Sequence, residues 1–327
     1  MESNITGRPT DERWLAHEGE QLRARVDSRF GADGMPEGWW FGRVSAVAED
    51  AQGDVYVAHR GPAGDPIVVF GRDGQYRRSW GRDLFRLPHG LRVDAVGHLW
   101  ATDVERHEVY EFDRDGRLLL TLGTRDTKGC TPDTFDMPTD VALGPDGTIY
   151  VSDGYGNCRI VRFSRDGRYL GEWGTRGRGP GEFDTPHSVV VAPDGTVWVS
   201  DRHNHRLQQF DTVGKHLRTV DGLGATQCIA FAPDGTPWVV TYRDVVELIA
   251  YDSLGGRLFE LDPGTFAIRR SLDVNAHWVQ PTADGHLWLA CLAGTVSHVY
   301  PGWIPAQGGA VDEREYLDAA EEATAEG

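Results

Sequence analysis

Short runs in which apolar and polar residues alternate recur along most of the chain, and turns rich in aspartate and glycine separate them. Alternation with a period of two is typical of β-strands that bury one face. The clearest unit lies near the middle of the chain, where Asp-Gly turns at 144–147 and 164–167 join successive strands. The strands that we expect in this unit span 139–143, 148–153, 159–163 and 169–174. The pattern therefore predicts units of four antiparallel strands joined by tight turns.

The same unit returns six times. The turn that follows its first strand contains Gly53, Gly97, Gly147, Gly195, Gly235 and Gly285, which are 44, 50, 48, 40 and 50 residues apart. A period of 40 to 50 residues with four strands per unit is typical of β-propeller blades. The last unit is short of one strand, so we expect a strand from residues 20–45 to complete it. The sequence thus predicts an all-β, six-bladed β-propeller whose ring is closed by an N-terminal strand.

The two ends of the chain do not follow the repeat. We divide the chain into an N-terminal extension (1–35), the propeller (36–305) and an acidic C-terminal tail (306–327). Residues 10–26 fit a short helix, and 23–30 could supply a strand. From Asp312 to Glu326 the tail has seven acidic residues and one arginine. We expect it to be a frayed helix or disordered, and we assign it no role.

Composition narrows the function. The net charge of −17 argues against nucleic acid or an anionic membrane as a partner. No run of about 18 apolar residues predicts a membrane span, and the N-terminus does not resemble a signal peptide. Four cysteines without metal-type spacing fit a cytoplasmic protein with reduced thiols. The sequence leaves open whether Cys130 and Cys158 form a disulfide.

One column of the repeat carries candidate chemistry. The residues eight positions before the turn glycines are Ser45, His89, Thr139, His187, Gln227 and His277. In a propeller the first strand of each blade lines the central channel, so equivalent positions form a ring. Histidines in alternate blades should therefore converge from three sides. Three imidazoles with an open fourth position are a typical catalytic zinc site.

Two alternatives stay open at this point. Iron, cobalt or copper also bind to imidazoles, so the histidines do not fix the metal. A single histidine on a strand is more often a hydrogen-bonded channel residue than a ligand, and the three could simply line the channel.

Several phrases in the sequence resemble a known family. Leu87-Pro88-His89-Gly90-Leu91, the run from Ile149 to Val161 with its Asp-Gly-Tyr phrase, and Pro186-His187-Ser188 resemble the peptidyl-α-hydroxyglycine α-amidating lyases. These enzymes, also called peptidylamidoglycolate lyases, are six-bladed propellers of the NHL-repeat type. The resemblance runs from about residue 40 to 220 and returns loosely at 270–300.

The resemblance implies a zinc-dependent lyase. Members of that family cleave the C–N bond of a peptidyl-α-hydroxyglycine to give a peptide amide and glyoxylate. Carried over by motif, the zinc ligands would be His89, His187 and His277. Tyr155 would be the base, and Arg60 would assist it in the active site. The expected partner is therefore a peptide or small-molecule substrate.

The sequence also departs from the family pattern near the third histidine. Asn275 replaces a methionine that lines the site, and Trp278 replaces an aspartate that helps to hold a structural calcium, which makes calcium doubtful. These changes favour, as an alternative, a zinc-dependent hydrolase, lyase or isomerase acting on another small metabolite. A non-catalytic NHL propeller that binds a ligand or protein is the remaining alternative, because a fold does not fix a function.

Overall fold

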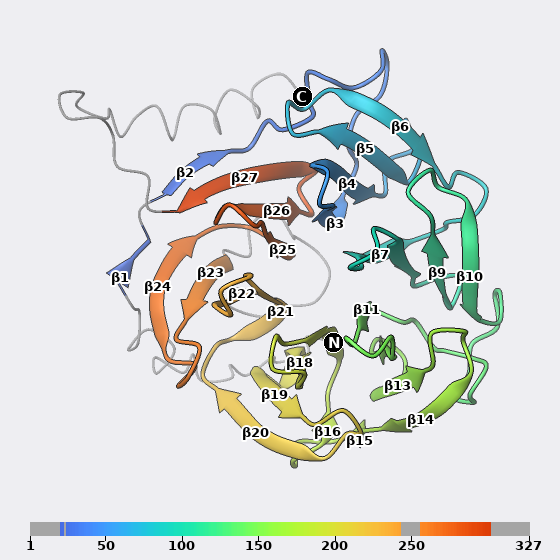
Figure 1. The fold of residues 1–327 in the computed structure, drawn as a ribbon, viewed down its shortest axis with the longest axis vertical. Coiled ribbons are helices and arrows are strands. Elements are labelled where there is room, and N and C mark those ends of the chain that lie inside the picture. Colours follow the sequence, from blue (N-terminus) through green and yellow to red (C-terminus); the bar gives the residue numbers. More distant parts are fainter. Residues whose placement is uncertain (1–19, 23, 243–255, 302–327) are drawn as a thin grey trace, which may run out of the picture.

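The computed structural model describes residues 20–22, 24–242 and 256–301. In these residues, six blades of four antiparallel strands each are arranged radially around a central channel (Figure 1), and β15 (Thr175–Arg176) and β16 (Glu182–Phe183) form an additional two-stranded parallel sheet. The predicted all-β, six-bladed β-propeller is confirmed. In the described residues no helix is long and apolar enough to cross a membrane.

From the channel to the rim, the first three blades contain β3 (Val44–Glu49), β4 (Asp54–His59), β5 (Ile67–Gly71) and β6 (Tyr76–Trp80); β7 (Pro88–Val93), β8 (Leu99–Asp103), β9 (Glu108–Phe112) and β10 (Leu118–Gly123); and β11 (Asp140–Leu143), β12 (Ile149–Asp153), β13 (Arg159–Phe163) and β14 (Tyr169–Trp173). The last three contain β17 (Pro186–Val191), β18 (Val197–Asp201), β19 (Arg206–Phe210) and β20 (His216–Asp221); β21 (Ala225–Phe231), β22 (Pro237–Tyr242), β23 (Gly256–Leu261) and β24 (Ile268–Asp273); and β25 (Trp278–Pro281), β26 (Leu287–Cys291), β27 (Thr295–Pro301) and β2 (Ala24–Asp27).

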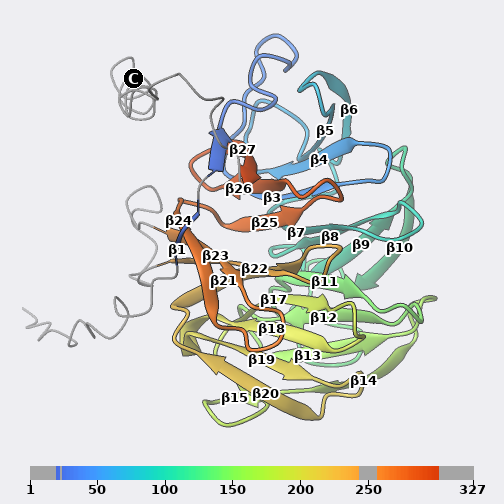
Figure 2. The same ribbon diagram turned by 60° about the vertical axis from the view of Figure 1, so that its left-hand side comes forward.

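The ring is closed by the N-terminal strand that the incomplete sixth unit predicted. Strand β2 pairs antiparallel with β27, with Val26 opposite Val299 (Figure 1). A second short strand, β1 (Glu20–Gln21), pairs in parallel with β24 of blade 5 (Figure 2). The helix considered for residues 10–26 is therefore wrong at residues 20–21 and 24–26, because the free edges of β24 and β27 offer hydrogen bonds to an extended chain. Residues 10–19 and the tail from 306 onward lie outside the described residues.

Aromatic residues from the second strand of each blade form the core between blades. Three positions after each turn glycine stand Tyr56, Trp100, Tyr150, Trp198, Trp238 and Trp288, all of them buried. The turn glycines themselves have φ between 80° and 87°, which is a left-handed conformation that other residues rarely adopt. The repeat thus fixes both the turn and the packing of every blade, and it leaves the channel-facing strands to carry function.

Candidate metal centre

The three predicted histidines meet in the channel. Their ligand nitrogens lie within 4.8 Å of one another, and their ring centroids are 4.8 to 5.0 Å apart. His89 lies on β7, His187 on β17, and His277 immediately before β25. All three are buried. The ring of first strands therefore places alternate-blade histidines together, as the repeat phase predicted.

A backbone carbonyl fixes the tautomer of each histidine. Nδ1 of His89 lies 2.7 Å from the carbonyl oxygen of Thr139, Nδ1 of His187 lies 2.7 Å from that of Gln227, and Nδ1 of His277 lies 2.7 Å from that of Ser45. A carbonyl oxygen can only accept a hydrogen bond, so each Nδ1 carries the proton. Each neutral ring therefore has the lone pair on Nε2, as metal-binding histidines do.

Burial keeps these histidines neutral. It lowers the pKa of His277 to about 3, and the positive charge of Arg60 adds to the effect. Burial also lowers the pKa of His89 and of His187 well below the usual value, with further contributions from neighbouring histidines and from Arg60 and Arg202. A metal binds neutral imidazole, so no ligand proton has to be displaced at neutral pH.

Tyr155 completes the cluster. Its hydroxyl lies 2.8 Å from Nε2 of His89 and 3.0 Å from Nε2 of His187. A phenol has one proton, so it can donate to only one of these two acceptors at a time. Nε2 of His277 has no hydrogen-bond partner among the residues that the structure describes. More acceptors than donors therefore face a common point, and a cation fits this donor set better than protein protons do.

Close backbone packing directs Tyr155 to the histidines. A Cβ on Gly154 would overlap the carbonyl oxygen of Pro186, and a Cβ on Gly156 would overlap the carboxylate of Asp136. The amide of Tyr155 also donates to the carbonyl of Met137 at 3.3 Å. The Asp-Gly-Tyr-Gly phrase is thus a tight turn that only glycines permit on either side of the tyrosine.

Two arginines flank the cluster. Arg60 donates from Nε to the carbonyl of Pro88 at 3.0 Å, beside His89. The guanidinium of Arg202, in the short 3-10 turn η2 (Arg202–Asn204), lies 5.2 Å from the ring centroid of Tyr155. Sequence reasoning missed Arg202, although a signal was present: Arg60 and Arg202 both stand seven positions after a turn glycine.

His59 supports the Arg60 loop. Its Nδ1 accepts hydrogen bonds from the amides of Gly42 at 3.3 Å and of Gly61 at 3.1 Å. Nδ1 is therefore unprotonated, and burial lowers the pKa of this histidine. The His-Arg-Gly phrase thus combines a positioning residue with the arginine that it positions.

A buried cation lies in the next layer of the channel. Nη2 of Arg92 lies 2.7 Å from Asp140 and 3.3 Å from the hydroxyl of Ser188, and the guanidinium carbon lies 4.3 Å from the Trp278 ring. These partners directly follow Thr139, His187 and His277 in the sequence. Because Arg92 itself lies on β7 with His89, one guanidinium links the segments of all three histidines and of one accepting carbonyl. Its charge also makes this layer unfavourable for a divalent cation.

Asp94, His98 and Glu111 form a second group whose ligand atoms lie within 4.8 Å of one another. Nη1 of Arg165 lies 2.7 Å from Glu111, and Nη2 lies 3.7 Å from Asp94. The arginine already supplies the positive charge at this position, so we assign no metal to it. All four cysteines are free thiols, and Cys130 and Cys158 are not bridged.

Comparison with known proteins finds one type of repeat in blades 3 and 4. NHL repeats are recognised at residues 135–163 and 183–210. The chain is 36% identical to peptidylglycine alpha-amidating monooxygenase of Rattus norvegicus over 160 residues, which is 41% of this chain and 16% of that protein. It is 32% identical to peptidyl-alpha-hydroxyglycine alpha-amidating lyase 2 of Drosophila melanogaster over 154 residues, which is 40% of this chain and 38% of that one. The matches thus cover well under half of these relatives.

A longer match extends over more of the ring. NHL repeat-containing protein 3 of Mus musculus is 35% identical over 226 residues, which is 64% of this chain and 65% of that protein. Among solved structures, a streptogramin B lyase superposes with a TM-score of 0.60 at 14% identity, over 85% of this chain and 98% of that one. Virginiamycin B lyase from Staphylococcus aureus gives a TM-score of 0.58 at 12% identity, over 85% and 99%. At these identities the two structures show a shared fold.

Proposed function

Because the chain is an NHL-repeat β-propeller related to the peptidyl-α-hydroxyglycine α-amidating lyases, we propose that it is a zinc-dependent lyase. Its substrate would be an α-hydroxyglycine-type carbinolamide, cleaved at the C–N bond to an amide and glyoxylate. The observation that carries the proposal is the convergence of three Nε2 atoms with the hydroxyl of Tyr155.

The donor set fits zinc. His89, His187 and His277 would hold the ion through Nε2, with each Nδ1 bonded to a carbonyl that maintains the tautomer. A zinc ion in such a site acts as a Lewis acid that lowers the pKa of a hydroxyl bound to it. The remaining chemistry belongs to side chains of this protein.

Tyr155 is placed to transfer the proton. As phenolate it takes the proton of the substrate hydroxyl, and the O–H electron pair becomes the second bond of the aldehyde carbonyl. The C–N bond breaks, its electron pair goes to the amide nitrogen, and Tyr155 returns the proton to that nitrogen. The products are an amide and glyoxylate, so the step consumes no water, oxidant or reductant.

The two arginines supply the charge that this step needs. Arg202 lies against the face of the Tyr155 ring, where its charge compensates the negative charge on the phenolate. Arg60 lies beside His89 and is suited to bind the substrate carboxylate, because a guanidinium forms paired hydrogen bonds with carboxylates.

The alternative substrate class rests on Asn275 and Trp278. Trp278 is fully buried and stacks near Arg92, below the histidines. Trp278 stands where the resembling family has an aspartate. This difference therefore changes the interior of the channel and not the region around Tyr155. Asn275 remains the residue that favours another small metabolite as substrate.

The proposal is tested by metal analysis together with glyoxylate release from N-benzoyl-α-hydroxyglycine. We expect about one zinc per chain and stoichiometric glyoxylate. Tyr155→Phe should retain the metal and lose about 10²- to 10⁴-fold in kcat, as expected for a lost general base. His187→Ala should lose both metal and activity. Zinc-loaded wild-type protein that releases no glyoxylate would overturn the proposed reaction, and a His187→Ala variant that keeps full metal content would overturn the site.

A further inference from the structure

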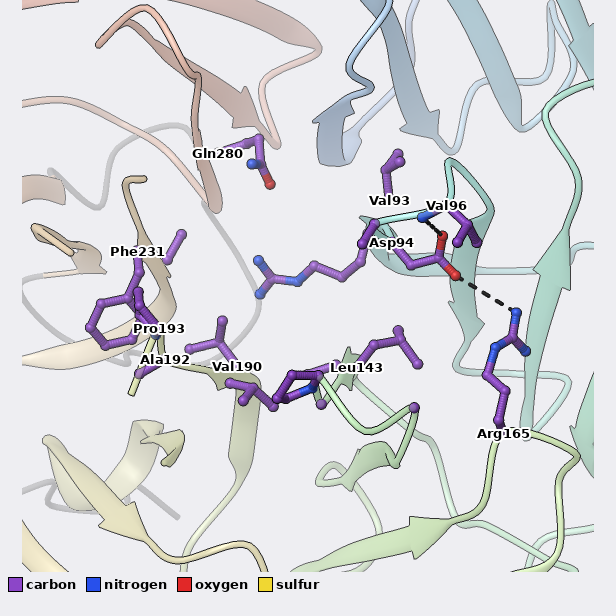
Figure 3. A pocket seen from close by; sticks show the side chains of 18 residues that line it. Val93, Asp94, Val96, Leu143, Arg165, Val190, Ala192, Pro193, Phe231 and Gln280 are labelled. Atoms are coloured by element: carbon purple, nitrogen blue, oxygen red, sulfur yellow. Dashed lines mark hydrogen bonds and ion pairs between the residues drawn. The ribbon is translucent and has the colours of Figure 1, made fainter. Parts of the chain in front are cut away.

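A cavity of about 530 Å³ opens at the end of the channel opposite the histidines (Figure 3). The ends of the first strands of blades 2 to 6 and the turns of blades 2 to 4 line it, and none of the three histidines does. A volume of this size is typical of sites for small molecules. We call this cavity the lower mouth. It is separate from the metal centre, because the layer that contains Arg92 and Asp140 lies between them.

The sequence explains why this end is hollow. Three positions after the histidine column, the channel-facing residues are Ala48, Arg92, Ala142, Val190, Ala230 and Gln280. Of these, Ala142, Ala230 and Val190 line the cavity and are too small to fill it, whereas the long polar side chains of Arg92 and Gln280 also line it. Hydrophobic walls with a few placed polar groups are the usual composition of a ligand site.

Arg92 offers an unused donor in this cavity. Its Nε and Nη2 are bonded to Asp140, Ser188 and Cys228. Nη1 of Arg92 has no hydrogen-bond partner among the residues that the structure describes. Arg92 is 8% exposed and lines the cavity, so it is a nearly buried side chain with two N–H groups left for a ligand.

Gln280 offers an unused acceptor. Its Nε2 donates to the carbonyl of Pro281 at 2.9 Å, which leaves Oε1 to accept a hydrogen bond. The side chain points from blade 6 toward the middle of the cavity (Figure 3). The cavity therefore presents one donor group and one acceptor at the same level of the channel.

The rest of the lining disfavours an ion. Val93, Leu143, Val190 and Phe231 supply apolar walls (Figure 3). The charge of Arg92 is balanced by Asp140, and at the rim Arg165 faces Asp94 and Glu111. A net charge of −17 on the chain adds to the cost of bringing in an anion.

We propose that the lower mouth binds a small apolar molecule carrying a neutral carboxamide. The amide oxygen accepts from Nη1 of Arg92, the amide N–H donates to Oε1 of Gln280, and the hydrocarbon part lies against the aliphatic walls. This site is additional to the lyase centre and does not depend on the proposed reaction. An amide released by that reaction would belong to the same chemical class.

Isothermal titration calorimetry with four probes that share a six-carbon chain tests the proposal: hexanamide, N,N-dimethylhexanamide, hexanoate and hexan-1-ol. We expect hexanamide to bind with a Kd on the order of 1 mM, as a ligand of this size permits. The other three should bind about tenfold more weakly, because each lacks the N–H donor, the neutral charge or the carbonyl. Hexanoate binding as tightly as hexanamide would overturn the assigned class.

Three variants locate the binding. Gln280→Leu should remove the preference for hexanamide over its dimethyl form while retaining weak binding of both. Leu143→Trp should fill the cavity and abolish binding, and a Leu143→Met control of similar volume should not. His187→Ala should bind hexanamide as the wild type does, whatever becomes of its activity. Loss of hexanamide binding in His187→Ala, or full binding in Leu143→Trp, would place the ligand elsewhere and overturn the proposal.

Discussion

At the level of single residues, the alternation of histidine with other residues has a structural cause. Each histidine donates through Nδ1 to the carbonyl of the same column position in the next blade, and these acceptors belong to Thr139, Gln227 and Ser45. A histidine in every blade would crowd six rings into the axis. Three rings and three carbonyl acceptors instead form a closed set around the channel.

Substitutions of Arg202 and Arg60 should affect different kinetic constants, kcat for Arg202 and KM for Arg60. Arg202→Met removes the charge next to Tyr155, so we expect kcat to fall about 10²- to 10³-fold, as when a preorganised charge-stabilising group is lost. Arg60→Met should mainly raise KM for a substrate with a free carboxylate and change KM for its methyl ester little. Steady-state kinetics with the acid and the ester measure both effects. Equal effects of the two substitutions on both substrates would contradict this division of roles.

At the level of elements, the turn that presents Tyr155 depends on Gly154. Gly154→Ala would press a methyl group against the carbonyl of Pro186, at the start of the strand that carries His187. We expect a loss of about 1–3 kcal/mol in unfolding free energy, as for other overpacked sites, together with lower zinc affinity. Gly264→Ala, where the nearest atom is 3.4 Å away, is the control and should change stability by less than about 0.5 kcal/mol. Chemical denaturation of both variants provides the comparison.

The Arg92–Asp140 pair links the first strands of blades 2 and 3. Arg92→Met leaves a fully buried carboxylate without its partner, so we expect a loss of about 3–5 kcal/mol. Adding Asp140→Asn removes the unpaired charge and should restore much of that loss. A double-mutant cycle by urea denaturation measures the coupling, and simple additivity of the two substitutions would show that the pair is not coupled.

The closing blade should be sensitive to acid. Burial, with a further contribution from His286, lowers the pKa of His298 to about 4, and its ring stacks on Trp288 at 3.9 Å. A histidine with a folded pKa below its unfolded value of about 6.5 favours the unfolded state as it takes up a proton. Its contribution is therefore fully present above pH 6.5 and is lost as the pH falls toward 4. We expect Tm to fall over this window less steeply in His298→Phe than in the wild type, and parallel curves would contradict the assignment.

At the level of the whole molecule, the repeat made much of the structure predictable, and ring closure accounts for what was not. Residues at one phase of every blade must share one level of the channel, so the meeting of His89, His187 and His277 followed from counting along the chain. The carbonyl partners did not follow, because they belong to neighbouring blades and depend on how the bulged first strands are spaced. Arg202 shares its phase with Arg60 and could have been found. The parallel pairing of β1 with β24 has no local signal in the sequence.

A metal bound at the centre would connect blades 2, 4 and 6, so its removal should destabilise the whole propeller. A ligand that binds only the folded state adds about 2.7 kcal/mol when its free concentration is 100 times its Kd. For a domain of this size, that corresponds to a Tm shift of about 4–5 °C. We expect a zinc chelator to lower Tm by this amount and added zinc to restore it, with no effect of either on His187→Ala.

Calcium should change Tm in neither protein, because the Arg92 guanidinium already supplies a positive charge in the channel layer below the histidines. A rise in Tm with calcium in both proteins would contradict this expectation.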